Sequence, residues 1–163
     1  MSRPLLEVES ILQQLIVEHR KLLKHVESHQ AAMRCFDLKA MDDAAKLQEG
    51  ARLRITMLEN KRKAATVQAA KLNRLEGDLT LKKLADLNPA RAPQLLALRD
   101  ELKTVVTAIA ARTHVAGRIA GAVLGHLNTV VRLLAGAVEQ AGVYTKHGVP
   151  QVSARIGVME AVG

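Results

Sequence analysis

The chain has 163 residues, a length that suits one domain. It contains one Tyr, one Phe and no Trp, so it lacks the aromatic side chains that usually wall a ligand pocket. A single cysteine excludes an internal disulfide and a multi-cysteine metal site. The formal net charge of +8 directs attention to acidic partners. Together these features disfavour an enzyme, and the abundance of Leu and Ala favours an all-helical protein.

An apolar seam predicts a first long helix that begins near Pro4 and ends near Phe36. Its members alternate steps of three and four residues, which is a heptad-like spacing. They are Leu5, Val8, Leu12, Leu15, His19, Leu22, Val26, His29, Met33 and Phe36. Ile11, Ile16 and Leu23 widen the seam, as a helix that faces two neighbours requires.

A second helix is predicted after a turn between Asp37 and Asp43, with Asp42 or Asp43 as its N-cap. The helix should fade near Gly77. Its expected inward residues are Ala44, Leu47, Ala51, Ile55, Leu58, Ala65 and Leu72.

A short helix is predicted over Thr80–Leu87 with Asp78 as its cap, and a third long helix from about Pro93 to Gln140. The seam of the third helix reads Leu95, Leu98, Leu102, Val105, Ile109, Ala116, Ile119 and Val123. We therefore predict an all-α fold, an elongated antiparallel helical bundle or coiled coil of three long helices with a short connecting helix. The bundle domain should span residues 1–142, and residues 143–163 should form a C-terminal tail, flexible or docked on a partner.

No residue pattern points to catalysis, a cofactor or a metal. His25 and His29 are one helical turn apart, but zinc requires three or four ligands, so a partly buried structural role is favoured for His29. Cys35 is interpreted as a small buried hydrophobe. The chain contains no Gly-rich phosphate loop and no recognisable nucleophile–base order. We therefore predict no catalytic residue, no cofactor and no bound metal.

Basic residues clearly outnumber acids between Arg52 and Lys83, and they include the run Lys61-Arg62-Lys63. Nucleic-acid binding usually adds stacking aromatics or a recognisable docking motif, and neither is present. A solvated helix face is therefore the favoured interpretation of the basic run, and nucleic-acid association is kept as an alternative.

Two features mark the last helix. Gly117, Gly121 and Gly125 form a ladder of small residues, which indicates either close packing inside the bundle or a surface that accepts a partner helix. The apolar run from His114 to Val143 is long enough to cross a membrane. It contains Arg118 and Arg132, however, and a central Arg costs about 2.5–3.5 kcal/mol on insertion scales. We therefore predict no membrane span.

Several short segments resemble one known family. The Leu-rich first helix carries Leu15, Glu18, Leu22 and Leu23, and it leads into Ala31-Ala32-Met33-Arg34-Cys35-Phe36-Asp37. The second helix carries Leu58-Glu59-Asn60-Lys61-Arg62. Near the end come Asn128, Leu133-Leu134 and Tyr144-Thr145-Lys146-His147-Gly148. Over residues 5–148 the chain resembles the FlgN family of flagellar type III export chaperones.

The resemblance implies a cytoplasmic protein that performs no chemistry. Such chaperones bind hook-associated (hook–filament junction) proteins, cover their helical terminal segments, prevent premature assembly and deliver them to the type III export apparatus. The resemblance also implies a C-terminal substrate-binding region. The candidate partner-binding residues there are Val123, Leu127, Val130, Val131, Leu134, Val138 and Tyr144. Two alternatives stay open, a structural coiled-coil homo-oligomer and a basic nucleic-acid-associated helical protein.

Overall fold

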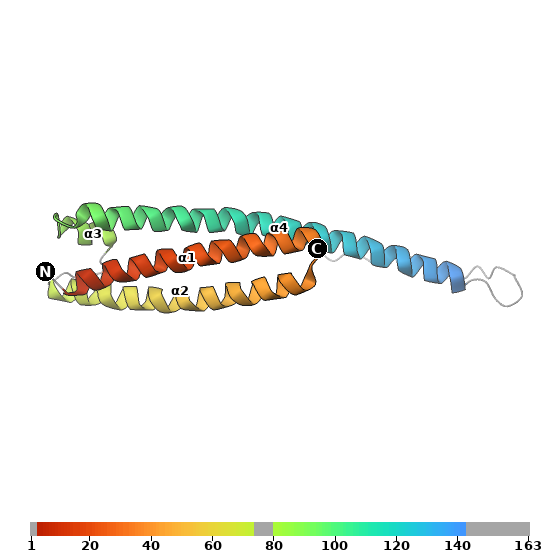
Figure 1. The fold of residues 1–163 in the computed structure, drawn as a ribbon, viewed down its shortest axis with the longest axis horizontal. Helices are drawn as coiled ribbons and strands as arrows, with labels where there is room; N and C mark the ends of the chain where they lie inside the picture. The colour runs from red at the N-terminus through yellow and green to blue at the C-terminus, as the bar shows by residue number, and fades with distance from the viewer. Residues whose placement is uncertain (1–2, 74–79, 143–163) are drawn as a thin grey trace, which may run out of the picture. The chain divides into compact units, whose positions relative to one another are not determined.

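The computed structural model describes residues 3–73 and 80–142, with the side chains of residues 4–73 and 80–137. These residues form four helices, α1 (Arg3–Cys35), α2 (Leu38–Leu72), α3 (Leu81–Asp86) and α4 (Ala92–Gly142), and no strand (Figure 1). The prediction of an all-α fold with three long helices and a short connecting one is confirmed. The chain divides into two compact units, one ending at Ala120 and the other beginning at Gly121.

The helices α1 and α2 form an antiparallel hairpin with a very short turn. Phe36 adopts a left-handed conformation with φ of 55°, and the N–H of Asp37 donates to the carbonyl of Ala32 over 3.0 Å. The Asp37 side chain then caps α2 by accepting from the N–H of Ala40 over 2.9 Å. The predicted turn between Asp37 and Asp43 was therefore wrong, because the chain reverses before Asp42 and Asp37 is itself the cap.

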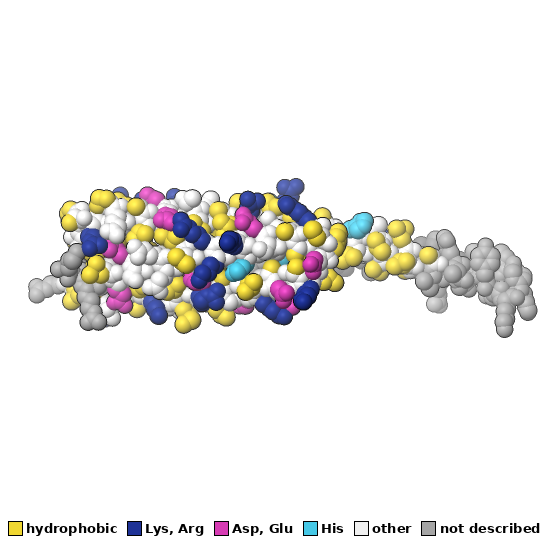
Figure 2. All heavy atoms as spheres, in the orientation of Figure 1, with side chains coloured by type: hydrophobic (Ala, Val, Ile, Leu, Met, Phe, Trp, Pro, Cys, Tyr) yellow, Lys and Arg dark blue, Asp and Glu magenta, His cyan; other side chains and the backbone are white. Residues whose placement is uncertain are grey.

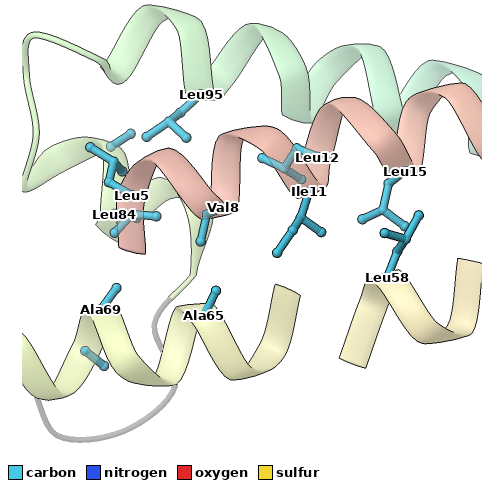
Figure 3. Packing of buried hydrophobic residues seen from close by; sticks show 12 residues of the cluster. Leu5, Val8, Ile11, Leu12, Leu15, Leu58, Ala65, Ala69, Leu84 and Leu95 are labelled. Atoms are coloured by element: carbon cyan, nitrogen blue, oxygen red, sulfur yellow. The ribbon is translucent and has the colours of Figure 1, made fainter. Parts of the chain in front are cut away.

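The core lies where α1 packs between α2 and the first part of α4 (Figures 1 and 3). Val8, Leu12 and Leu15 of α1 are completely buried, as is Leu95 of α4. The main cluster consists of Leu5, Val8, Ile11, Leu12, Leu15, Leu58, Ala65, Ala69, Ala70, Leu84, Ala85 and Leu95. The seam predicted for α1 is largely confirmed, but its last member is wrong: Phe36 is 57% exposed because it lies in the turn.

The inward face of α2 differs from the prediction at two leucines. Leu47 and Leu72 are exposed, whereas Gln48 is buried. The amide nitrogen of Gln48 lies 3.0 Å from Nδ1 of His29 and 3.4 Å from the carbonyl oxygen of His25. Gln48 turns inward because these two acceptors on α1 satisfy its amide group there.

Three polar contacts set the direction of α4 against α1. Arg91 pairs with Glu9 at 2.7 Å, Arg20 pairs with Glu101 at 2.6 Å, and the Gln30 amide donates to the carbonyl of Arg112. The residue numbers rise together on both helices, so α4 runs parallel to α1 and antiparallel to α2. The contact at Gln30 lies little more than one turn before α1 ends at Cys35.

The connection between α2 and α4 contains α3. The α2 helix ends at Leu72, before the predicted Gly77, and the Asn73 side chain donates to the carbonyl of Ala69 over 2.7 Å. Thr80 caps α3, because its hydroxyl accepts from the N–H of Lys83. The cap predicted at Asp78 lies outside the described residues. Leu84 is 1% exposed and anchors α3 in the core.

The first prediction concerns the buried face of α1. Replacing Leu12 by Ala should lower the free energy of unfolding by about 2–5 kcal/mol, because its side chain is fully buried and its removal leaves a cavity. Leu6 on the same helix is 41% exposed, so Leu6→Ala should cost well under half as much. Urea denaturation followed by circular dichroism measures both. Equal losses in the two variants would contradict the assignment of the core.

The second prediction concerns Glu18, which receives Arg54 Nε at 2.7 Å and Lys21 Nζ at 2.6 Å. The hydrogen bond from Arg54, followed by that from Lys21, lowers the pKa of this carboxyl. A lowered folded-state pKa stabilises the protein above the unfolded pKa of about 4.3, and this stability is lost as the pH falls through the folded value. Glu18→Gln should therefore destabilise the protein at pH 7 and converge with the wild type toward pH 3. The exposed Glu7→Gln is the control, and a difference that persists at pH 3 would contradict the mechanism.

Candidate partner-binding site on α4

The apolar seam of α4 continues after the residues that pack in the bundle. Within the first unit, Leu95 and Val105 are buried and Ile109 packs against the second core cluster, Leu22, Val26 and Ala51. In the second unit the same steps of three and four residues continue. They fall on Val123, Leu127, Val130 and Leu134. At about 100° per residue, these four side chains lie within an arc of about 60° on the helix.

The continued seam is exposed. Leu127 is 49% exposed, Val130 39% and Leu134 61%, and the adjacent Val131 is 62% exposed. Val123 is half-buried. These are five of the seven predicted partner-binding residues, and the helix places them on one broad face. The side chain of Val138 and the whole of Tyr144 lie outside the described residues.

Two residues of this surface were missed from the sequence. Leu124 is 66% exposed and Leu133 is 69% exposed, and they lie at the two edges of the same apolar arc. The sequence alone could have indicated both residues, because leucines beside a seam widen the apolar face of a helix, as in helices that pack against two neighbours. Figure 2 shows hydrophobic side chains along this stretch of α4 on its visible face. The surface, here called the α4 seam, therefore comprises Val123, Leu124, Leu127, Val130, Val131, Leu133 and Leu134.

The glycine ladder does not belong to the α4 seam. A methyl group built on Gly117, Gly121 or Gly125 would meet no atom of the described residues within 4 Å. The interpretation of close packing inside the bundle therefore finds no supporting contact in the described chain. Gly121 also lies about 160° around the helix from Val123, so a helix docked on the seam would lie on the other side of α4.

Polar groups occupy the face opposite the seam. Arg118, Asn128 and Arg132 are exposed there, and no Asp or Glu occurs between Glu101 and Glu139. By length and composition, the stretch Ala92–Ala137 is also long and apolar enough to cross a bilayer, which is weak evidence taken alone. The one-sided distribution of its apolar residues is typical of a helix that packs one face on a protein partner.

The histidine, cysteine and lysine positions considered in the sequence analysis form no metal site among the described residues. His29 bonds to Gln48, as expected for a half-buried structural histidine. Cys35 is exposed at the end of α1, so its assignment as a buried hydrophobe was wrong. Among the described residues, no three His, Cys, Asp or Glu side chains converge as metal ligands would. Lys61 and Lys63 are exposed, and Arg62 pairs with Glu59 at 2.8 Å.

The third prediction tests the position of the glycine ladder. Gly121→Ala should stabilise α4 by up to about 1 kcal/mol, because Ala has the higher helix propensity and the added methyl group meets open space. Amide hydrogen exchange of residues near 121 and a thermal melt measure the effect. Destabilisation by this substitution would indicate a tightly packed neighbour on the ladder.

Comparison with known proteins identifies the family of the chain. The model of the family described as "FlgN protein" matches residues 5–151, which is most of the chain. No curated protein matches the chain, and no solved structure does. FlgN is a family of flagellar chaperones, not of known enzymes, and the earlier resemblance is confirmed. With its helical hairpin, its long last helix and this match, the chain belongs to the FlgN family.

Proposed function

We propose that this protein is a cytoplasmic export chaperone for hook-associated flagellar proteins. It binds their helical terminal segments, prevents premature assembly and delivers them to components of the type III export apparatus. The single observation that supports this proposal most is the exposure of the α4 seam. Membership of the FlgN family, whose chaperones are in general soluble cytosolic proteins, supports the compartment.

The chemistry of the α4 seam suits an amphipathic helix. A partner helix with apolar residues at matching steps of three and four can lie along the seam and remove its side chains from water. Full burial of one Val or Leu is worth about 1.5–3 kcal/mol, and the seam offers seven such side chains. Part of this gain is offset by the entropy of ordering the partner.

Covering the partner is the protective step of the proposal. Helical segments that assemble through apolar faces aggregate when those faces are exposed, and the α4 seam provides a substitute apolar partner. The seam consists of Val and Leu side chains, so the proposed interaction rests on apolar contact. We propose that Val138 and Tyr144 extend the same surface.

The fourth prediction tests the α4 seam with charged substitutions. Val130→Asp and Leu134→Glu should each weaken binding of a junction-protein terminal fragment by about tenfold or more, because a charge would be buried in an apolar contact. Isothermal titration calorimetry measures the affinity. Both side chains are exposed, so the thermal melts should match that of the wild type.

A matched control lies on the opposite face of the same helix. Asn128→Asp adds one negative charge at an exposed position and should leave the affinity nearly unchanged. Unchanged affinity in folded Val130→Asp and Leu134→Glu would contradict the proposed surface. Sedimentation of the free chain addresses the alternative of a homo-oligomer, since a stable dimer that Leu134→Glu separates would assign the seam to self-association.

A further inference from the structure

A hollow lies on the surface of the α1–α2 hairpin. It has a volume of about 410 Å³ and is lined by residues of α1 and α2, and no described residue of α4 contributes to it. Val17 and Met57 lie on its two sides, with Leu58 between the helices. This hollow, here called the hairpin groove, is therefore separate from the α4 seam.

Two of the apolar residues that line the hairpin groove do not belong to the core. Val17 is 49% exposed and Met57 is 60% exposed, although both belong to helices whose inward positions are filled by other residues. Methionine has a flexible, polarizable side chain that adapts to different partners, so its exposure in a groove favours a binding role.

Unpaired cations flank these apolar side chains. The acid of the hairpin groove, Glu18, is already bonded to Lys21 and Arg54. Lys61 also lines the groove, and Lys24 lines an adjoining hollow that shares Val17. Neither lysine forms an ion pair with any described residue, so both ammonium groups are available to an acidic partner.

The two lysines fix the length of the partner. Arg54 of α2 pairs with Glu18 of α1, so in the antiparallel hairpin Lys61 lies level with about residue 11 of α1, and Lys24 lies about 13 residues further along that helix. At about 1.5 Å per residue, the two positions are about 20 Å apart along α1, which is between three and four turns of a docked helix.

We propose that the hairpin groove binds an acidic amphipathic helix of another protein, with its apolar residues on Val17 and Met57 and its carboxylates on Lys24 and Lys61. A nucleic acid is disfavoured because the groove contains no aromatic side chain on which bases could stack. A membrane is disfavoured because the apolar side chains line a hollow between two helices. The proposed occupant is another protein, because residues 143–163 of this chain contain Lys146, Arg155 and a single acid, Glu160, and so lack the acidic character that the lysines would select.

The proposal goes beyond cargo binding. Because the groove and the α4 seam share no residue, the acidic helix would have a binding site distinct from the one proposed for cargo. In this proposal the net positive charge of the chain favours an acidic partner and accelerates its association with the groove.

A synthetic peptide tests the groove in the full chain. The probe is a fluorescent helix of about four turns with Leu on one face and Glu elsewhere, and its control carries Lys in place of every Glu. Fluorescence anisotropy should show binding of the acidic peptide that weakens with salt, and no comparable binding of the basic peptide. Lys61→Glu and Met57→Glu should each weaken binding of the acidic peptide by about tenfold or more.

Matched controls come from the same helix. Lys63→Glu changes the net charge as Lys61→Glu does, but its side chain lies about 160° around α2 from Lys61. Val67→Glu replaces another exposed apolar residue that does not line the groove. Both should leave the affinity within about twofold of the wild type, as rim and remote changes usually do. If a variant fails to fold by circular dichroism, Lys61→Gln and Met57→Gln replace it.

Several outcomes would overturn the proposal. Absence of acidic-peptide binding, or an equal loss with Lys63→Glu, would show that the groove does not select an acidic helix. Binding that disappears in Leu134→Glu and persists in Met57→Glu would place the peptide on the α4 seam, while cargo binding there would remain valid. A duplex oligonucleotide or phosphatidylserine vesicle that binds through Lys61 in place of the peptide would show that the partner class is wrong.

Discussion

The apolar seam of α1 is the constraint on which the bundle depends. It is wide enough to face α2 on one side and α4 on the other, with Leu12 and Leu15 buried completely. The α2 helix contributes mostly alanines, including Ala51 and Ala65, so it can approach α1 closely. Loss of the α1 seam would therefore leave neither neighbour with a partner.

Helix length then decides what remains uncovered. The α4 helix has 51 residues, whereas α1 has 33 and α2 has 35. At about 1.5 Å per residue, α4 exceeds α2 by about 24 Å, so α2 is too short to cover the whole length of α4. The apolar period continues through Val123, Leu127, Val130 and Leu134, and an exposed apolar face on a regular helix is the physical basis of the proposed cargo site.

Polar contacts fix the register in which these helices meet. A seam of Leu, Val and Ala tolerates sliding by a heptad, since apolar contacts have little directionality. The buried Gln30 and Gln48 each bond to an acceptor on a neighbouring helix, and Arg91 pairs with Glu9 at the other end of α1. A slipped register would bury these groups without partners, at a cost of about 1–3 kcal/mol each.

The sequence by itself determined the helices, their order, the α1 seam and the family, because helical periodicity is local and the family segments are contiguous. It also predicted a partner surface on the last part of α4, where the structure exposes Leu127, Val130, Val131 and Leu134, and the role of that surface stays a prediction. It could not locate the turn, since Phe36 takes a left-handed conformation that usually marks Gly. Nor could it choose Gln48 over Leu47, because steps of three then four and of four then three fit one seam equally well. That choice, like the hairpin groove, depends on which side chains of a second helix lie opposite, and only the tertiary structure brings them together.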